Sequence, residues 1–412
     1  MNKTDSHTEL NCDVAVIGAG PSGIAAAIRA RTFGARVLLV EREGSVGGMS
    51  TTGLLNVWCG DCDSAFYRQI RKRVTYHRGR RDVFSPEELK SIYIDELERA
   101  GVEVLLHTTV IDANINNRKI ENVTLFCCSE RITLKAKIFI DATGNGDLSL
   151  LCGLPYEKGR PSDGLMQPIT LEFSLGGVDD AKAIYPTFGR NNDLQAKMRE
   201  YVDAGRILPP AGHIILIEGI EPSTAHANMT NAIMLDGTDP FEYTKAEILC
   251  RKQIPQIIEF LRECVPGYEH CFLMATASYA GIRESRRFVG RYQLTEYDIL
   301  AERVFDDYVV RGAMYCFGNH NLTGSGSDPH NLEYNGQKYT IPYSSLVPKD
   351  IDNLLFCGRN ISGTHMAHGS YRVMPICMGI GEGAGTAAAI CAADNLTAPE
   401  VDTGRVRDIL GI

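Results

Sequence analysis

The sequence lacks any long apolar run. No hydrophobic stretch reaches the roughly 18 residues that a membrane-spanning helix requires. The first residues, MNKTDSHTELNC, lack the apolar core of a signal peptide, and the 13 cysteines follow no regular spacing. These absences predict no membrane span and a location in the reducing cytoplasm.

Basic residues are scarce relative to acidic ones. The 42 Lys and Arg residues and 51 Asp and Glu residues give a formal net charge of −9. Because nucleic-acid binding depends on a basic surface, we expect no nucleic-acid partner. The run from Arg68 to Arg81 is a local exception with seven Lys and Arg residues, and we interpret it as the solvated face of a helix.

The composition that remains is typical of a globular protein, with 44% hydrophobic and 23% charged residues. A chain of 412 residues exceeds the usual size of a single core, so two domains are expected. The 40 glycines suggest backbone turns around a ligand.

Residues 13–41 contain a complete dinucleotide-binding pattern. An apolar strand leads into Gly18-x-Gly20-x-x-Gly23, an alanine-rich helix, and a second strand that ends at an acidic residue. The first glycine permits a tight turn, the second lets the backbone approach a pyrophosphate, and the third allows close helix–strand packing. The acidic residue accepts hydrogen bonds from a ribose, and the helix N-terminus faces the phosphates. The predicted contacts are Gly18, Gly20, Pro21, Ser22, Gly23, Glu41 and Arg42.

The segment GSVGGMSTTG, residues 44–53, follows the acidic strand end. It resembles the Gly-Gly segment of flavoproteins, which carries the phosphates and ribityl chain of FAD. No second GxGxxG with a flanking strand and helix occurs later, so a built-in NAD(P)H domain is not expected. FAD is therefore the predicted dinucleotide, with contacts at Gly47, Gly48, Met49, Ser50 and Thr51.

Alternating apolar residues predict strands near 102–106, 110–115, 121–127 and 131–135, which form a meander inserted after the first βαβ unit. The stretch KIFIDATGNGD, residues 137–147, adds an apolar strand that ends in glycine. This exit resembles the second FAD contact of the glutathione-reductase-like fold. The predicted contacts here are Val110, Ala142, Thr143 and Gly144.

From about residue 153 to 285 the pattern changes. Strands are expected within 168–175, 213–220 and 228–236, and amphipathic helices over about 193–204 and 240–264. We interpret this region as a cap or substrate domain. The stretch GIRESRR, residues 281–287, holds three arginines, which are either solvated or structurally paired, or face the flavin or an anionic substrate. Arg283, preceded by small residues, is the expected inward-facing member.

Two further segments leave alternatives open. Residues 319–331, NHNLTGSGSDPHN, form a polar loop that is either an ordinary surface connection or a mobile lid. Cys59 and Cys62 have CxxC spacing but no thioredoxin-like βαβ unit around them. They also lie well past the Gly-Gly step. Structural or incidental cysteines are therefore favoured over a redox pair.

The segment HMAHGSYRVMPICMGIGEGAG, residues 365–385, places two histidines, a tyrosine and an arginine against the start of an apolar helix. Pro375 suits the first turn of that helix, and the following glycines and alanines allow close packing beneath a flat ligand. The helix end would direct its positive dipole at the pyrimidine edge of a flavin. An apolar strand precedes this segment, and the predicted cofactor contacts are Gly358, Arg359 and Met374.

Taken in order, these motifs resemble the broad FAD-dependent oxidoreductase family related to fumarate reductase and succinate dehydrogenase flavoproteins. The resemblance implies an α/β fold in which a Rossmann-like FAD-binding domain, made of a parallel sheet and a β-meander, carries an inserted α+β cap domain. We expect residues 1–152 to form the first part of the FAD-binding domain, 153–285 the cap, and 286–412 the return to the FAD-binding domain.

The stretch His368-Gly-Ser-Tyr-Arg372 is similar to the His-Gly-x-x-Arg segment of the fumarate reductase group, whose arginine holds a substrate carboxylate. This similarity implies the same role for Arg372. The histidine to which that group attaches FAD has no counterpart among residues 47–53, so non-covalent FAD is expected.

The expected reaction is hydride transfer between flavin N5 and a carbon of a small organic substrate. Both anionic and uncharged substrates are left open. His365 or His368 is the expected acid or base, Tyr371 orients the substrate, and Arg372 and Arg283 hold an anionic group. No metal site is expected.

Other functions remain open at this point. One alternative is a flavoprotein subunit that exchanges electrons with a separate redox partner, although no ligand-spaced cysteine set suggests an iron–sulfur cluster in this chain. A flavoprotein that modifies nucleic acid is disfavoured by the acidic balance. A homo-oligomer is also left open.

Overall fold

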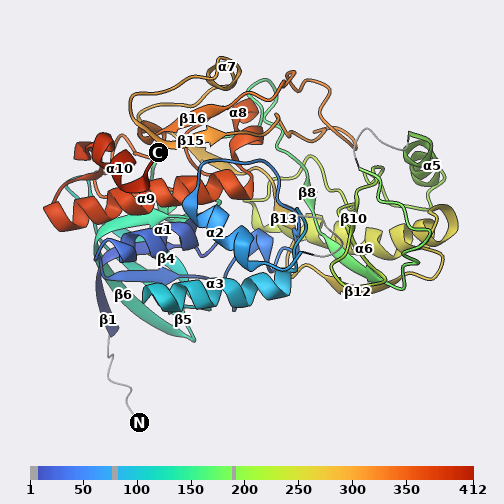
Figure 1. Ribbon diagram of the computed structural model, residues 1–412, viewed down its shortest axis with the longest axis horizontal. Coiled ribbons are helices and arrows are strands. Elements are labelled where there is room, and N and C mark those ends of the chain that lie inside the picture. The colour runs from blue at the N-terminus through green and yellow to red at the C-terminus, as the bar shows by residue number, and fades with distance from the viewer. Residues whose placement is uncertain (1–7, 77–81, 188–191) are drawn as a thin grey trace, which may run out of the picture.

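The computed structural model describes residues 8–76, 82–187 and 192–412. Figure 1 shows a larger part, which contains a sheet covered by α1, α3 and α9, beside a smaller part that contains β10, β12, α5 and α6. The two are joined through short strands that include β8 and β13. The fold thus brings two separately packed bodies side by side.

The central sheet is built on short runs of aliphatic residues. Its parallel strands lie in the order β3, β2, β1 and β6, and β17 pairs in parallel with the end of β6. Ile17 lies opposite both Val40 and Asp141, so β1, β2 and β6 end at the same level. Ligands of such sheets bind outside the carboxyl ends of the strands. The bounds are β1 Thr8–Ile17, β2 Val37–Val40, β3 Glu103–Leu105, β6 Glu130–Asp141 and β17 Leu354–Phe356.

The meander consists of β4 (Thr109–Asn116) and β5 (Lys119–Cys127), which pair antiparallel with each other and with the first half of β6. The separate strands expected at 131–135 and 137–141 are one strand, because β6 pairs with β5 at its start and with β17 at its end. The strand expected at 102–106 is β3, which pairs with β2 outside the meander.

One face of the sheet is covered by α1 (Pro21–Thr32), which packs directly on α9 (Met374–Asp394). A Cβ on Gly381 would lie 2.1 Å from the carbonyl oxygen of Ser22, and one on Gly385 would lie 2.2 Å from that of Ala26. These α9 glycines therefore let two helix backbones touch. The expectation that they pack beneath a flat ligand is wrong for these two positions.

Within the described part of the chain, α9 is the one helix long and apolar enough to span a membrane, and 94% of its most apolar window is buried inside the protein. The expectation that no stretch reaches this length and apolarity is therefore wrong. The burial is that of a core helix.

The smaller part contains a four-stranded antiparallel sheet in the order β10, β11, β9 and β12. Helix α6 (Pro240–Cys264) has the predicted bounds, with Asp239 capping its first turn and Pro240 at its start. Helix α5 (Asn192–Asp203) lies near the predicted 193–204. The strands are β9 Phe173–Gly176, β10 Leu216–Glu218, β11 Thr224–Ala227 and β12 Phe272–Thr276.

The strand expected within 228–236 does not form, and β11 lies just before this range. Polar side chains take the backbone groups there instead. The amide of Leu171 donates to the Thr230 hydroxyl at 2.8 Å, and the amide of Asn231 donates to the Gln253 side chain at 2.8 Å. Only Ala232 makes an isolated bridge, to Ile169.

The remaining elements connect or cover these two bodies. Strands β7 and β14, β8 and β13, and β15 and β16 form antiparallel pairs. Their bounds and those of the other helices are β7 Tyr156–Lys158, β8 Ile169–Thr170, β13 Gly281–Ile282, β14 Arg286–Phe288, β15 Tyr308–Ala313, β16 Tyr339–Pro342, α2 Ala65–Arg73, α3 Pro86–Ala100, α4 Asp147–Leu151, α7 Glu296–Leu300, α8 His365–Tyr371 and α10 Thr403–Leu410.

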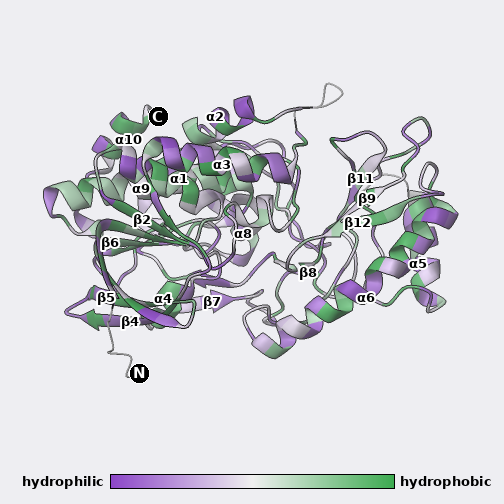
Figure 2. Cartoon of the chain, turned by 90° about the horizontal axis from the view of Figure 1, so that it is seen from below, coloured by the Kyte–Doolittle hydropathy of each residue, from purple (hydrophilic) through white to green (hydrophobic). Residues whose placement is uncertain are grey.

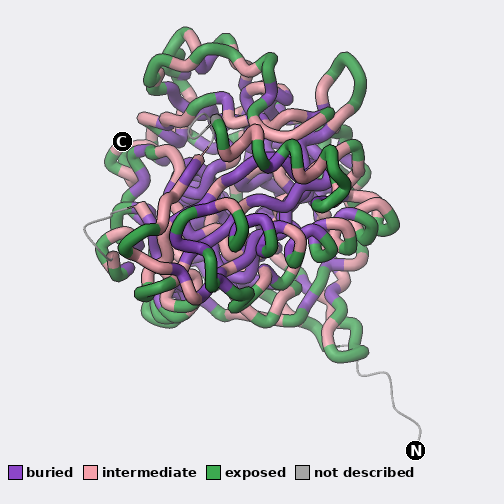
Figure 3. Tube along the Cα trace, turned by 90° about the vertical axis from the view of Figure 1, so that its right-hand side faces the viewer, coloured by how far each residue is buried: buried purple, intermediate pink, exposed green. Residues whose placement is uncertain are grey.

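Two hydrophobic cores result. One draws on residues within 14–154 and 288–406, and the other on residues within 169–280. Figure 2 shows apolar residues along the central strands and a mixture of apolar and polar residues along the helices, and Figure 3 shows the buried chain concentrated in the interior. The α/β class with a Rossmann-like parallel sheet is confirmed, while the domain boundaries stay a prediction.

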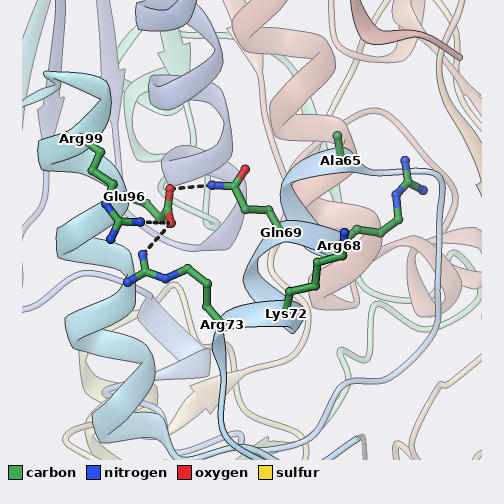
Figure 4. Close-up of a pocket in the computed structure, with 7 residues that line it drawn as sticks. All are labelled: Ala65, Arg68, Gln69, Lys72, Arg73, Glu96 and Arg99. Atoms are coloured by element: carbon green, nitrogen blue, oxygen red, sulfur yellow. Dashed lines mark hydrogen bonds and ion pairs between the residues drawn. The ribbon is translucent and has the colours of Figure 1, made fainter.

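The first part of the basic run forms α2. Arg68 and Lys72 are exposed, as predicted for a solvated face, but Arg73 donates to Glu96 on α3 at 2.5 Å. Gln69 and Arg99 converge on the same carboxylate at 2.6 and 3.3 Å, beside a surface hollow of about 540 Å³ (Figure 4). This group, the Glu96 clamp, ties α2 to α3. The part of the run within 77–81 lies outside the described residues.

Candidate active site

A cavity of about 640 Å³ lies at the carboxyl edge of the parallel sheet and continues to β10 of the smaller sheet. It is lined from segments far apart in the chain, which include the turns after β1, β2 and β6, the Gly-Gly segment, and residues around 283, 320 and 372. A cavity that joins the two bodies is a typical place for a ligand site.

The three motif glycines divide into two kinds. Gly18 has a φ of 103°, and a Cβ there would lie 2.5 Å from the carbonyl oxygen of Ala142. A Cβ on Gly23 would lie 1.9 Å from the carbonyl oxygen of Gly18, whereas one on Gly20 would meet no atom within 4 Å. The protein's own packing requires Gly18 and Gly23. Gly20 faces open space, as a backbone that approaches a pyrophosphate must.

The start of α1 provides the phosphate-binding groups. Gly20 is its N-cap, Pro21 lies in its first turn, and no side chain caps it. Pro21 and Ser22 line the cavity. The free amides of an uncapped helix N-terminus, with its positive dipole end, suit an anion. This arrangement fits a dinucleotide.

Glu41 is buried at the end of β2 and lines the cavity. Its carboxylate accepts hydrogen bonds from the amides of Ala19 at 2.6 Å and Glu43 at 3.0 Å. Burial raises its pKa. Arg42 follows, with its guanidinium 5.7 Å from the ring centre of Tyr279. Glu41 therefore holds the glycine turn in place and also borders the space expected for a ribose.

The Gly-Gly segment is a tight turn held by its own side chains. Gly47 has a φ of 103°. The Ser50 hydroxyl donates to the carbonyl of Gly47 at 2.7 Å, and the Thr51 hydroxyl donates to that of Val46 at 2.6 Å. Gly47, Ser50 and Thr51 thus shape the turn without lining the cavity. The lining residues in this region are Gly48, Met49 and Val110.

The turn after β6 adds a second wall. Gly144 has a φ of 77°, and a Cβ there would lie 2.7 Å from the guanidinium of Arg359. Arg359 donates to the Asn145 side chain at 2.8 Å, and its buried Nε has no partner. Gly358 does not line the cavity. It packs against α1, since a Cβ there would lie 2.6 Å from the Ser22 hydroxyl. The cavity-lining residues among these predictions are Ala142, Thr143, Gly144, Arg359 and Met374.

We call the part of the cavity lined by Gly18, Gly20, Glu41, Arg42, Gly48, Ala142, Thr143, Gly144 and Arg359 the nucleotide section. The part lined by Glu172, Arg283, Tyr315, His320 and Arg372 is the arginine section.

Arg283 points into the cavity, as predicted. Its guanidinium donates to the carbonyl of Pro168 at 2.8 Å, to the Thr170 hydroxyl, and to the side chain of Asn228 at 3.2 Å. Burial, together with repulsion from the Arg372 guanidinium, lowers the pKa of Arg283 to about 10. Two cationic side chains therefore line the same section of one cavity.

Arg372 is only partly satisfied by the protein. It donates to the carbonyl of Gly318 at 2.7 Å, and its buried Nε has no partner. The nearby carboxylate of Glu172 is engaged by His226 at 2.6 Å and Asn228 at 3.0 Å. Among the described residues no carboxylate forms a salt bridge with either cavity arginine. The Glu172 carboxylate offsets part of the positive charge of the two arginines, and the excess that remains suits an anionic ligand.

His320 and Tyr315 also line the arginine section, and the sequence interpretation missed both. Burial, with Arg283 and Arg372 nearby, lowers the pKa of His320 far below its usual value, so the ring is neutral near pH 7. Burial raises the pKa of Tyr315, which keeps its hydroxyl proton. No local motif marks either residue.

The polar loop at 319–331 begins inside the protein. The Gln167 side chain donates to that of Asn319 at 2.8 Å, and both residues are buried. His320 in this loop lines the cavity, whereas Thr323, Ser327, Pro329 and His330 are exposed, as expected for a surface connection.

The structure places His365, His368 and Tyr371 outside the cavity lining. They lie at three-residue spacing on α8, which turns this face into the core. His365 hydrogen-bonds Glu284 at 2.8 Å, and the Tyr371 hydroxyl donates to the carbonyl of Ile361 at 3.2 Å. These three side chains therefore face the core and not the cavity in which a substrate would bind. Arg372, the first residue after α8, is the one that reaches the cavity.

Cys59 and Cys62 have different surroundings. Cys59 lines the cavity, and burial raises the pKa of its thiol to about 11. Cys62 is buried away from it, with its thiol donating to the carbonyl of Pro375 at 3.1 Å. The CxxC pattern does not place two thiols on the cavity wall.

The residues present therefore fit FAD. The open space at Gly20, the uncapped α1 N-terminus and the unpartnered Arg359 Nε form a cradle for a pyrophosphate-linked dinucleotide.

Curated relatives are similar over part of the chain. Thiamine thiazole synthase of Aeropyrum pernix is 28% identical over 202 residues, which are 43% of this chain and 70% of that protein. The thiamine thiazole synthase of Desulfosudis oleivorans is 28% identical over 154 residues, or 33% of this chain and 57% of that protein. The similarity thus spans a little over half to about two thirds of these relatives' length.

A solved structure shows a similar fold across most of the chain. It is a geranylgeranyl bacteriochlorophyll reductase-like protein from Thermoplasma acidophilum, with a TM-score of 0.50, 13% identity, and coverage of 94% of this chain and 80% of that one. At this identity the likeness concerns the fold alone. None of the relatives named here is a fumarate reductase or succinate dehydrogenase, so the resemblance to that group stays a prediction.

The family profile described as FAD dependent oxidoreductase matches residues 13–410, from the first strand to the last helix. This span includes the nucleotide section and the arginine section. With the glycine cradle that the structure shows, the match establishes that the chain belongs to the FAD dependent oxidoreductase family.

Proposed function

We propose that this enzyme transfers a hydride between FAD and a small organic anion held by Arg283 and Arg372. The observation that carries the proposal is the position of these two arginines. They lie in the same cavity as the dinucleotide motif, with one nearby carboxylate, Glu172, against two guanidinium groups, so the section keeps an excess of positive charge. An anion in that space would relieve their repulsion and satisfy the Arg372 Nε.

The nucleotide section would hold FAD. Gly20 and the α1 amides meet the pyrophosphate, Glu41 borders the ribose, and Arg359 adds a cation. FAD, when bound, supplies the group that accepts or gives the hydride.

The arginine section would position the substrate and move its proton. Arg372 and Arg283 bind the anionic group. Neutral His320 accepts a proton from a substrate hydroxyl or amine, and a bound anion favours this by stabilising the imidazolium. Tyr315 remains protonated and donates a hydrogen bond. We therefore assign to His320 the proton-handling role that the sequence suggested for His365 or His368.

Anaerobic screening of hydroxy acids, amino acids, enoates and uncharged alcohols tests this function. The flavin absorbance band of the FAD-loaded protein should bleach with an anionic compound but not with its uncharged analogue. Arg372→Gln and Arg283→Gln should each slow reduction by at least about 100-fold without loss of FAD. Arg405→Gln, on an exposed arginine of α10, is the matched control.

His320→Gln separates proton transfer from binding. We expect a lower rate of flavin reduction with little change in substrate affinity, and loss of the wild-type pH dependence. Unchanged rates in both arginine variants would refute the role of the anion. An unchanged rate in His320→Gln would remove the histidine from the mechanism.

A further inference from the structure

We infer that the substrate is a monocarboxylate with an apolar body several carbons long. The inference rests on the proposed function, since it takes the arginine section as the place where the anionic group binds. It is based on two cavity walls, formed by residues 55–59 and by residues at β10.

One wall is the extended segment 55–59. Leu55, Val57 and Cys59 line the cavity, whereas Asn56 and Trp58 between them are buried in the protein. This two-residue alternation is that of a β-strand. The segment is held by hydrogen bonds from Trp58 N to Asp82 O at 2.7 Å and from Phe84 N to Asn56 O at 3.0 Å. It presents a row of weakly polar side chains to the ligand.

The second wall comes from the smaller sheet. Ile215, which directly precedes β10, and Leu216 and Ile217 of β10 all line the cavity. The backbone amide of Asn228 donates to the carbonyl of Ile215 at 3.0 Å, and the Asn228 side chain accepts from Arg283 at 3.2 Å. The aliphatic wall is thus joined directly to the residue that would bind the carboxylate.

The charges of the lining provide for one anionic group. Arg283 and Arg372 lie close enough to influence each other. The other lining arginines belong to the nucleotide section, where the Arg42 guanidinium lies 5.7 Å from the ring centre of Tyr279 and Arg359 donates to the Asn145 side chain at 2.8 Å. A second carboxylate further along the substrate would meet no other arginine of this section. It would lie against the aliphatic residues of the two walls, beside Tyr185 and Thr187, or near the Glu172 carboxylate, and none of these surroundings supplies a cation.

Chain-length dependence tests this inference. Acetate, butanoate and hexanoate are titrated into the FAD-loaded protein, with succinate and adipate as dicarboxylates of matched length, and binding is followed by perturbation of the flavin spectrum. Each added methylene should tighten binding of the monocarboxylates by about 3- to 4-fold. Each dicarboxylate should bind at least about 10-fold more weakly than the monocarboxylate of the same length.

Variants locate the effect. Ile217→Asn should reduce the gain to less than about 2-fold per methylene while acetate still binds. Val57→Thr, which keeps the side-chain shape, tests the opposite wall should Ile217→Asn fail to fold. Arg372→Gln should weaken all carboxylates. Ile248→Asn, at a residue on α6 that is 49% exposed and outside the lining, should behave as the wild type.

The possible results separate the preference for an apolar monocarboxylate from the binding of an anion by the arginines. Equal affinity along the monocarboxylate series, or tighter binding of succinate or adipate, would overturn the inference while the arginine-dependent function stands. If no carboxylate perturbs the flavin and Arg372→Gln changes nothing, the proposed function itself is refuted.

Discussion

The nucleotide and arginine sections of the cavity are built in different ways. The nucleotide section consists largely of backbone and glycine, contributed by turns that directly follow β1, β2 and β6. The arginine section consists of side chains that converge from the residue before β9, the residue after β13, the stretch between β15 and the loop at 320, and the end of α8. The first is a local conformation repeated at several strand ends, and the second exists only when distant segments meet.

The difference explains why one section carries a readable motif. Gly18 and Gly23 are demanded by contacts within a few residues or across one strand pair. Arg283 and His320, by contrast, face the same space from two separate parts of the chain. A motif of contiguous residues therefore indicates the local backbone contacts of the nucleotide section. It does not indicate which distant side chains meet in the arginine section.

The largest effects are expected from two glycine substitutions in the dinucleotide motif, one of which disturbs folding and the other FAD binding. Gly23→Val forces a side chain into the Gly18 carbonyl and should cost at least about 3 kcal/mol of unfolding free energy. A Cβ on Gly20 would meet no protein atom within 4 Å, so Gly20→Val should lower the melting temperature of the apoprotein far less than Gly23→Val, while FAD affinity falls by more than about 100-fold. Thermal unfolding and flavin fluorescence titration measure both. A Gly20→Val protein that binds FAD normally would contradict the assignment.

The next largest effect is expected from a substitution of Glu284, which is the neighbour of Arg283 in the arginine section. The buried Glu284 carboxylate bonds Arg287, His365 at 2.8 Å, and the amide of Gln167 at 3.1 Å. Glu284→Gln removes the close carboxylate partner of the buried Arg287 guanidinium and should cost about 3–5 kcal/mol in urea unfolding. Glu263→Gln, at a residue whose side chain is 43% exposed, should cost less than about 1 kcal/mol.

Because Glu284 follows Arg283 in the chain, the surviving folded protein should also lose affinity for carboxylates while keeping FAD. Equal weakening of FAD and carboxylate binding would show that the two sections are not separable.

A pH-dependent effect comes next. Burial lowers the pKa of His368 far below its ordinary value, and neither ring nitrogen has a partner. Below pH 6.5 the unfolded chain takes up a proton that the folded ring refuses, so stability falls as pH falls, by up to about 1.4 kcal/mol per pH unit. His368→Leu should reduce this slope between about pH 5.5 and 4, as measured by urea unfolding. His330→Leu, at an exposed position, should leave it unchanged.

The smallest effect concerns a region remote from both sections. Glu96→Gln removes the charge of the Glu96 clamp and should cost about 1–2 kcal/mol, because the carboxylate is buried but its arginine partners are partly solvated. FAD and carboxylate affinities should not change. Asp95→Asn, at a side chain that is 51% exposed, should shift stability by less than about 0.5 kcal/mol. Altered ligand binding in Glu96→Gln would mean that the clamp communicates with the cavity.

Much of the fold was predictable because it follows from short-range patterns. Helix α6 has its capping residue and proline at the expected start, and the meander follows from alternation. The prediction failed where pairing depends on distant partners, as in the long β6, or where side chains take over backbone hydrogen bonds, as at Thr230 and Asn231.

For the candidate site, the cavity position of Arg283 and Arg372 follows the sequence interpretation, whereas that of His365 and His368 does not. Helical spacing on α8 turns both histidines into the core, a consequence of how that short segment docks.

The amino-acid sequence by itself determined the dinucleotide cradle, since glycine conformations and strand–turn–helix order are properties of contiguous residues. Only the tertiary structure decided which polar side chains share the substrate end of the cavity. Convergence of His320, Arg283 and Arg372 depends on how two hydrophobic cores pack beside each other, and no local pattern encodes that packing.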